Sequence, residues 1–464
     1  MAATHERPAG ELRRVLTLPA LVLFGLVYMV PLTVFTTYGL VTVQTGGRLP
    51  TTYLITSVAM FVTALSYGAM VRAFPVAGST FTYATSVFGP VVGFVAGWSL
   101  LLDYMFLPMI NYLVIGLYLN AQLPSIAPWV FVLAGILAVT VLNVVGIDSI
   151  AKANLVIIAA QAIFIAVFVV LGLSARDAGA SLVEPFVGNG FYASDGVDPS
   201  HGIGPLLAGA AVLCLSFLGF DAVSTMAEET PEPRRDIPRA ISWVTIGSGL
   251  LFTLLAYLAH LVLRAPRCLP ALDPGCTFAD TAAIDVMVRA GGRALSVGFV
   301  AAYVAGAFGS ALTSQASVSR ILYTMGRDGA LPRRVFGQLE PRFGTPVLAI
   351  LSVSAVSLLA IWVSLGILAS MISFGALVAF SVVNLAVIKH YLVDEHRRGL
   401  RDVVVHGVLP CIGCVLTGWL WTSLSHESLT VGLEWLSAGI VYLAVLTRGF
   451  TRRPPTMHLS DTAS

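Results

Sequence analysis

The chain has 464 residues, of which 57% are hydrophobic and only 11% are charged, and its formal net charge is +2. Its mean hydropathy is +0.87, and soluble domains carry about 25% charged residues. A soluble core could not hide this much apolar surface, so the composition excludes a soluble globular protein and indicates an integral membrane protein.

The N-terminal tail is polar and leads directly into the first apolar run. Residues 1–14 include Arg7, Arg13 and Arg14, and the apolar run begins at Thr17. This run is longer than the apolar part of a signal peptide and has no small-residue cleavage site. It therefore predicts a first membrane helix.

Hydropathy predicts twelve segments long enough to cross a bilayer, because a crossing helix needs about 20 apolar residues. With the N-terminus inside, the inner loops and tails hold most of the 26 Lys and Arg residues. The positive-inside rule then predicts that both termini are cytoplasmic. The segments span residues 18–44, 51–73, 89–122, 128–147, 151–174, 204–227, 240–263, 294–325, 345–364, 367–393, 406–424 and 428–447.

Two of these segments are interrupted midway. Segment 18–44 contains Gly25 and then Tyr-Met-Val-Pro at 28–31, and segment 204–227 contains Phe-Leu-Gly-Phe-Asp at 217–221. Broken helices in corresponding positions of two halves are typical of transporters built from inverted repeats, with the binding site at the breaks. Two ordinary kinks are the alternative. The predicted division is a tail (1–14), a first repeat (15–200), a second repeat (201–400), two extra helices (401–447) and a tail (448–464).

Asp221 lies at the second break, near the depth where a bilayer is least tolerant of charge. Ionisable residues inside a membrane are costly, and they usually face a cavity, a partner or a pathway. We therefore expect Asp221 to bind a substrate or a proton. The alternative is that it only bonds the freed backbone of its own break.

Three groups of motifs cover nearly the whole chain: residues 70–84 with 88–98, 216–223 with 228–241, and 319–332 with 344–346. These motifs resemble the amino acid–polyamine–organocation superfamily of transporters. Five further stretches are residues 31–35, 97–111, 214–230, 317–323 and 374–380. Within the superfamily, these stretches resemble bacterial putrescine importers most.

This resemblance implies the fold and the activity. The implied fold is an all-α membrane protein of 12 transmembrane helices, with a LeuT-like 5+5 inverted repeat, two extra helices and broken helices 1 and 6. The implied activity is proton-coupled import.

The first break carries no glycine-rich backbone to hold a substrate carboxylate. Residues 28–33 read Tyr-Met-Val-Pro-Leu-Thr, and Pro31 lacks a backbone N–H. Amino acid transporters of this type use backbone N–H groups at such a break to bind the carboxylate. The sequence therefore favours a substrate without one.

A diamine needs anions or aromatic faces at both ends, and three residues can supply them. Asp221 is one anion, and Asp103 lies about 14 residues, or roughly 20 Å, into its own segment. In the resembling importers, the position of Tyr104 lies on the substrate path, and its ring could hold an ammonium by a cation–π contact. Adjacent helix positions point about 100° apart. We therefore expect Tyr104 at the substrate, with Asp103 proton-linked or structural.

Several other residues are candidates for the pathway, each with a packing alternative. Tyr28, Phe217, Gly219 and Phe220 flank the breaks, and Ser314 faces the pathway or the core. At the inner end of segment 204–227, an interfacial salt-bridge network or a cytoplasmic gate is expected from Glu228 and Glu229, beside Arg234 and Arg235. His260 is expected at the membrane interface.

Several residues are candidates for coupling transport to an ion. Some proton-coupled relatives carry a lysine midway along segment 5, and the matching position here is Gln161, which cannot exchange a proton. A proton would have to bind Asp221, Asp103 or the glutamates. Sodium coupling stays an alternative, with Thr313 and Ser317 as ligands.

The five cysteines do not suggest a disulfide scaffold. Cys268 and Cys276 share one loop predicted to be outside, where a disulfide can form. Cys214, Cys411 and Cys414 lie in apolar segments and are expected to be packing residues.

The sequence as a whole predicts a secondary active transporter that imports a small cationic amine, with putrescine as the expected substrate and a proton as the coupling ion. A permease of the same fold for an amino acid or a monoamine is the alternative. No nucleotide-binding loop, metal-ligand cluster or nucleophile–base pair is present, so neither an enzyme, a cofactor, a metal nor a nucleic-acid partner is expected. The expected location is the bacterial inner membrane.

Overall fold

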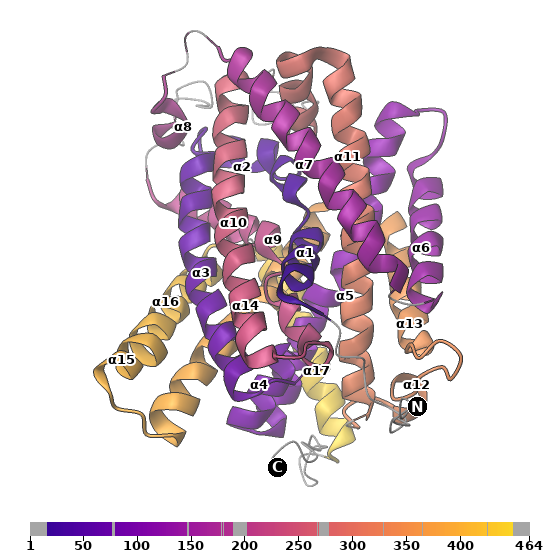
Figure 1. Cartoon of the computed structure of the whole chain (residues 1–464), viewed down its shortest axis with the longest axis vertical. Helices are drawn as coiled ribbons and strands as arrows, with labels where there is room; N and C mark the ends of the chain where they lie inside the picture. The colour runs from indigo at the N-terminus through magenta and orange to yellow at the C-terminus, as the bar shows by residue number, and fades with distance from the viewer. Residues whose placement is uncertain are drawn as a thin grey trace, which may run out of the picture.

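The computed structural model describes the chain from residue 16 to residue 448, with gaps. Within the described residues the chain consists of helices, turns and loops and contains no strand. Most helices run along the long axis of the molecule (Figure 1). The predicted all-α fold is therefore confirmed over this part. The described residues are 16–76, 79–145, 148–177, 179, 181–188, 202–266, 268, 278–327, 329–363, 365–424 and 426–448.

The structure contains 11 helical stretches that are long and apolar enough to cross a membrane, counted over the described residues. The predicted segment 345–364 is the shorter apolar stretch Val347–Ile361, formed by α13 (Val347–Ser357) and η4 (Leu358–Ile361). The chain is thus a multi-pass membrane protein, and the count of twelve crossings stays a prediction.

The uninterrupted helices agree with the predicted segments within a few residues at most ends. The exceptions are α10, which begins seven positions before its predicted segment, and α14, which ends six positions before the end of its segment and continues as a π-helical turn. A π-helical turn also precedes α16. These helices are α3 (Leu49–Ala73), α5 (Pro90–Gln122), α6 (Pro128–Val145), α7 (Asp148–Ser174), α10 (Pro233–Val262), α14 (Leu365–Val387), α16 (Leu409–Thr422) and α17 (His426–Leu446). Shorter pieces are α8 (Glu184–Val187), α12 (Arg333–Phe336), η5 (Ile388–Asp394), α15 (Leu400–Val403) and η6 (Val404–Val408).

Both predicted interruptions are present. The first crossing is divided into α1 (Leu18–Met29), η1 (Pro31–Phe35) and α2 (Tyr38–Gln44). The other is divided into α9 (Gly204–Phe217) and η3 (Ala222–Glu229).

Besides the four-residue pieces α8, α12 and α15, two helical stretches in the described part of the chain were not predicted by hydropathy. The first is α4 (Ser79–Phe88), which is too short to cross a bilayer and packs on α5. The second is the beginning of α11 (Phe278–Arg327), separated from its apolar part by a kink at Gly291 and Gly292, where Gly292 has φ +70°. Its sequence is interrupted by charges such as Asp285, so a hydropathy window reads it as a loop.

The long helix α5 forms the centre of the bundle. It packs against α4, α6, α11 and α14, while α3 packs along α10. In its apolar window 83% of the residues are buried, compared with 17% for α17. A polar side chain on α5 therefore lies inside the protein, whereas α17 lies at the periphery.

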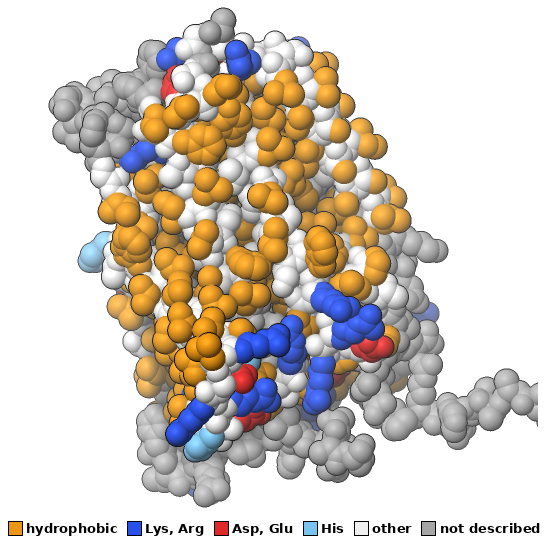
Figure 2. Space-filling model, turned by 60° about the vertical axis from the view of Figure 1, so that its left-hand side comes forward, with side chains coloured by type: hydrophobic (Ala, Val, Ile, Leu, Met, Phe, Trp, Pro, Cys, Tyr) orange, Lys and Arg blue, Asp and Glu red, His pale blue; other side chains and the backbone are white. Residues whose placement is uncertain are grey.

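The surface is divided by side-chain type along the long axis. Apolar side chains cover the middle of the face shown in Figure 2, and Lys and Arg side chains gather at its lower end, with fewer at the upper end. The lower end is also the end at which α12, with Arg333 and Arg334, lies in Figure 1. The orientation that puts this basic end in the cytoplasm stays a prediction.

A pair of tryptophans attaches the peripheral helix α17 to α5. The Trp98 indole N–H donates to the Trp435 carbonyl and the Trp435 indole N–H donates to the Trp98 carbonyl, both at 2.9 Å. The two rings are stacked with their centroids 5.0 Å apart. Gly439 lies against the same indole, so that a Cβ on Gly439 would be 2.3 Å from Trp98 Cδ1.

We expect Gly439→Ala to lower the melting temperature of the purified protein, because overpacking a well-filled interface costs about 1–3 kcal/mol. Gly418→Ala on α16 is the matched control, since a Cβ there meets no atom within 4 Å. Alanine has the higher helix propensity, so this control should leave the melting temperature unchanged or slightly higher. Equal melting temperatures for the two variants would show that the Trp98 contact is not tight.

Candidate substrate site

Asp221 lies directly after the break between α9 and η3. Gly219, at the break, has φ +128°, a conformation that residues with a side chain rarely adopt. This turn brings the Gly219 N–H within 3.1 Å of Asp221 Oδ1, to which it donates. Asp221 is only 1% exposed. The Asp221 carboxylate therefore does bond the backbone of its own break, which was the alternative to a role in binding.

The second oxygen of Asp221 faces α5. The Tyr104 hydroxyl donates to Asp221 Oδ2 at 2.7 Å, and the Tyr104 ring lies 6.2 Å from the Tyr28 ring, centroid to centroid. Four of the predicted substrate residues, Asp221, Tyr104, Tyr28 and Gly219, are therefore brought together. They come from three segments of the chain and form a buried group of one carboxylate and two aromatic rings.

The first break has no glycine and is strained. Val30 has φ +52°, which is unusual for a β-branched residue, and such strain tends to occur at functional sites. The next residue, Pro31, has no N–H to donate. The Tyr28 carbonyl accepts from Ser310 Oγ at 2.7 Å, and Ser310 Oγ in turn accepts from Asn111 Nδ2 at 3.0 Å.

Asn111 and Ser310 were not predicted as site residues. Asn111 lies seven positions after Tyr104 on α5, which is two helical turns and therefore the same face. That spacing is a signal the sequence offered for Asn111. Ser310 offered none, because it is one of several small hydroxyl residues on α11.

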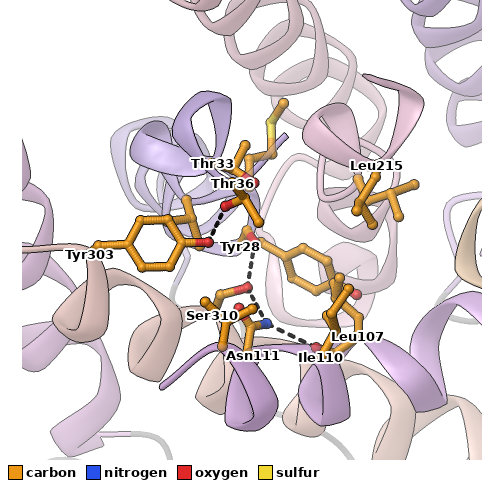
Figure 3. Close-up of a pocket in the computed structure, with 13 residues that line it drawn as sticks. Tyr28, Thr33, Thr36, Leu107, Ile110, Asn111, Leu215, Tyr303 and Ser310 are labelled. Atoms are coloured by element: carbon orange, nitrogen blue, oxygen red, sulfur yellow. Dashed lines mark hydrogen bonds between the residues drawn. The ribbon is translucent and has the colours of Figure 1, made fainter. Parts of the chain in front are cut away.

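A small cavity of about 30 Å³ lies beside the first break (Figure 3). It has room for about two water molecules. Tyr28 and Leu218 belong to its lining, whereas Asp221 and Tyr104 do not. The site is therefore closed in this conformation and would have to open for a substrate. The lining residues are Tyr28, Met29, Val30, Thr33, Thr36, Leu107, Ile110, Asn111, Val114, Leu215, Leu218, Tyr303 and Ser310.

One hydroxyl pair joins the first break to α11. The side-chain hydroxyls of Thr36 and Tyr303 are hydrogen-bonded (Figure 3). Both residues also line the cavity. This contact links the residue after η1 to α11.

The two phenylalanines at the second break belong to aromatic clusters. Phe220 stacks on Phe380 with centroids 5.3 Å apart and meets the edge of Tyr67, while Phe217 meets the edge of Phe252 at 5.4 Å. Both phenylalanines are completely buried and neither lines the cavity. Core packing therefore describes both of them in this conformation.

The hydroxyl residues of α11 bond mainly to their own helix. Ser314 Oγ donates to the Ser310 carbonyl at 2.6 Å, and Thr313 Oγ1 donates to the Gly309 carbonyl at 3.0 Å. Neither lines the cavity. The role predicted for Ser314 therefore stays a prediction.

Gln161 fills the space between α7 and α11 next to the first break. Its Nε2 donates to the Ala302 carbonyl at 3.4 Å, and a Cβ on Gly306 would be only 1.6 Å from Nε2. The same Cβ would be 3.0 Å from Val30 Cγ1. A neutral amide, which cannot exchange a proton, therefore lies beside the first break.

The predicted charge network at the end of η3 includes a partner on another helix. Glu229 forms an ion pair with Arg320 of α11 at 2.9 Å, and its carbonyl accepts from the Leu16 N–H at 3.0 Å. Arg235, which was expected beside the glutamates, pairs with Glu232 at 2.8 Å. Glu229 thus joins the beginning of α1, the end of η3 and α11.

His260 lies near the end of α10, as expected, and it is completely buried within the protein. Its predicted depth at the membrane interface stays a prediction. Its Nε2 is 3.8 Å from Glu184 Oε1. The Arg264 guanidinium donates to Glu184 at 2.6 Å, and this hydrogen bond raises the pKa of Arg264. The Arg264–Glu184 pair therefore attaches the α8 turn to the end of α10, next to His260.

The cysteines are divided between free and bonded. Cys214, Cys411 and Cys414 are free, and Cys214 is buried. Cys268 is disulfide-bonded. Cys276 lies outside the described residues, so the pairing of Cys268 with Cys276 stays a prediction.

A helical membrane bundle interrupted at two breaks, with a buried carboxylate at one of them, has the features of a transporter. The family model for the amino acid permease family matches residues 20–423. The chain therefore belongs to this family, and it is a permease rather than an enzyme.

The relatives include polyamine and amino acid transporters. The chain is 39% identical to the low-affinity putrescine importer PlaP of Escherichia coli over 98% of this chain and 97% of that protein. It is 26% identical to the branched-chain amino acid permease BcaP of Bacillus subtilis over 95% of both chains. It is 27% identical to cationic amino acid transporter 7 of Arabidopsis thaliana, over 84% of this chain and 67% of that one.

Proposed function

We propose that this permease imports a small cationic amine, with putrescine as the expected substrate, by proton symport with alternating access. The observation that carries the proposal is the Asp221–Tyr104 pair at a break whose partner segment, at Val30 and Pro31, has no glycine-rich backbone. The anion suits an ammonium, and the first break is poorly suited to a carboxylate. The 39% identity to a putrescine importer supports the same substrate class.

The proposed architecture is the LeuT-like arrangement of two inverted five-helix repeats, residues 15–200 and 201–400, followed by two extra helices at 401–447. With the proposed twelve crossings, both termini, 1–14 and 448–464, lie on the same side of the membrane. We propose that this side is the cytoplasm of a bacterium and that the protein lies in its inner membrane. The interrupted first and sixth crossings and the basic end of the molecule support this arrangement.

In the proposed binding mode, one ammonium of the amine bonds the Asp221 carboxylate between the rings of Tyr104 and Tyr28. A desolvated cation–π contact contributes about 2 kcal/mol. The methylene chain extends into the enlarged cavity, past apolar residues such as Leu218. The other end reaches the amide and hydroxyl groups of Asn111 and Ser310.

Alternating access requires contacts that break and re-form on either side of the site. The Glu229–Arg320 ion pair joins η3 to α11 at the end of the molecule proposed to be cytoplasmic. The Thr36–Tyr303 hydroxyl pair joins the first crossing to α11 on the other side of Tyr28. We assign the first contact to the inner gate and the second to the outer gate.

The second candidate function is import of an amino acid or a monoamine by the same fold. The names of two relatives at 26% and 27% identity favour it. It requires a carboxylate-binding backbone at the first break, and Val30 and Pro31 are unfavourable for that purpose.

Uptake of labelled putrescine into proteoliposomes with an acidic exterior tests the proposal. We expect concentrative uptake that unlabelled diamines inhibit and that neutral amino acids do not. Competition by amino acids as strong as that by diamines would instead support the second candidate. Absence of labelled uptake would contradict the proposal.

A further inference from the structure

Asp103 is a second carboxylate in the same buried region, and it differs from Asp221 in its bonding. Asp103 is 1% exposed, and neither of its carboxylate oxygens has a hydrogen-bond partner among the described residues. Asp221, in contrast, accepts from the Tyr104 hydroxyl and from the Gly219 N–H. Among the described residues, the Asp221 carboxylate therefore has hydrogen-bond donors and the Asp103 carboxylate has none.

The backbone of α14 packs directly on the turn of α5 that carries Asp103. A Cβ on Gly375 would be 2.7 Å from the Ser99 carbonyl oxygen and 2.8 Å from the Asp103 nitrogen. This close approach leaves no space for a side chain at position 375 between the two helices. It fixes the backbone of the turn that carries Asp103.

The titratable groups around Asp103 that the structure describes include no cation. Its titratable neighbours are Asp221 after α9, Tyr28 of α1, Tyr67 of α3 and Tyr104 of its own helix. No Lys, Arg or His forms an ion pair with Asp103 within the described parts of the chain. The charged group that acts on it among the described residues, Asp221, is another carboxylate.

These surroundings separate the roles of the two carboxylates. An ionised carboxylate that is buried without a partner is expensive, and two carboxylates in one site do not both ionise easily. Hydrogen bonds from Tyr104 and Gly219 stabilise an anion at Asp221, where a cation can join it. Asp103 has no such donors, so its charge is most easily removed by a proton.

We propose that Asp103 carries the coupled proton, while Asp221 holds the ammonium; this assignment rests on the proposed function. When the site is open outward, the ionised Asp103 takes a proton from hydronium and releases water. Neutral Asp103 and the Asp221–ammonium pair then cross together without net charge at either carboxylate. When the site opens inward, Asp103 returns its proton to water.

Asp103→Asn tests the assignment because it mimics a permanently protonated residue. Proteoliposomes would be held at zero membrane potential with potassium and valinomycin, and the outside would be one pH unit more acidic. Wild type should concentrate labelled putrescine about tenfold at equilibrium for one coupled proton. Asp103→Asn should not concentrate it at all. It should still exchange internal unlabelled putrescine for external labelled putrescine at a rate within about threefold of wild type.

Each outcome has a defined meaning. Concentrative uptake by Asp103→Asn equal to that of wild type overturns the assignment, and so does loss of exchange by a correctly inserted variant. Absence of exchange by wild type overturns the proposed function together with the assignment. If Asp103→Asn cannot be purified as folded protein, Asp103→Glu replaces it. A shifted pH dependence of its concentrative uptake supports the assignment, and an unchanged dependence overturns it.

Discussion

Asp221→Asn is expected to lower putrescine uptake by at least about 100-fold while the protein still inserts and remains folded. Removing one partner of a buried charge pair costs about 3–5 kcal/mol, and each 1.4 kcal/mol is a tenfold change in affinity. Binding and exchange of labelled putrescine in proteoliposomes would measure the loss. Exchange must be lost here, in contrast to Asp103→Asn.

The asparagine is chosen because it can keep the local hydrogen bonds. Its Oδ1 can still accept from the Gly219 N–H, and its Nδ2 can donate to the Tyr104 oxygen, which reverses the bond that Tyr104 now donates to Asp221. A size-exclusion profile and melting temperature close to those of wild type are therefore expected. Wild-type uptake by this variant would reduce Asp221 to a structural group.

Tyr104→Phe should lower putrescine transport less than Asp221→Asn does. It keeps the aromatic ring and removes only the hydroxyl that donates to Asp221 Oδ2 at 2.7 Å. A hydrogen bond to a charged group contributes about 1.5–3 kcal/mol, so the apparent affinity for putrescine should fall by about tenfold to 100-fold. A loss intermediate between wild type and Asp221→Asn is the expected order.

The centre of the candidate site could be predicted because its residues conflict with their surroundings. Asp221 is a charge in an apolar segment, and Gly219 and Pro31 interrupt apolar helices; each is visible in a single stretch of sequence. Tyr104 came from resemblance rather than from such a conflict. Its contact with Asp221 joins positions 117 residues apart.

The rest of the site depends on packing between distant segments, which a single sequence does not contain. The bond from Ser310 to the Tyr28 carbonyl spans 282 positions, and the pair of Thr36 and Tyr303 spans 267. Serine and threonine are common in membrane helices, so these residues carry no local signal. The partner of Glu229 was missed for the same reason, since Arg320 lies on α11 rather than next to it in the chain.

The fold was predicted best where a hydrophobic run is long enough to cross a bilayer. It was missed at α4, which is a helix of ten residues, and at the beginning of α11, which carries charges. Hydropathy detects long apolar runs, and it does not detect a helix that is short or interrupted by charges. Both helices therefore needed the tertiary structure.

Gly219→Ala is expected to reduce putrescine transport by at least about tenfold, although it changes no charge. The φ of +128° at Gly219 is unfavourable for alanine by about 1–2 kcal/mol. The added Cβ would also be 2.7 Å from Tyr28 Cδ1 and 2.8 Å from Met29 Cγ. Relief of these contacts would move the break away from Tyr28, and with it the N–H that Gly219 donates to Asp221.

Gly89→Ala separates the effect of backbone strain from the effect on the site. Gly89 has φ +91° at the junction of α4 and α5, and a Cβ there meets no atom within 4 Å. Both variants should lower the melting temperature, because both pay the left-handed backbone penalty. Only Gly219→Ala should also lower the affinity for putrescine, because only that Cβ collides with Tyr28. Equal transport by the two variants would mean that the precise geometry of the second break is not required for binding the amine.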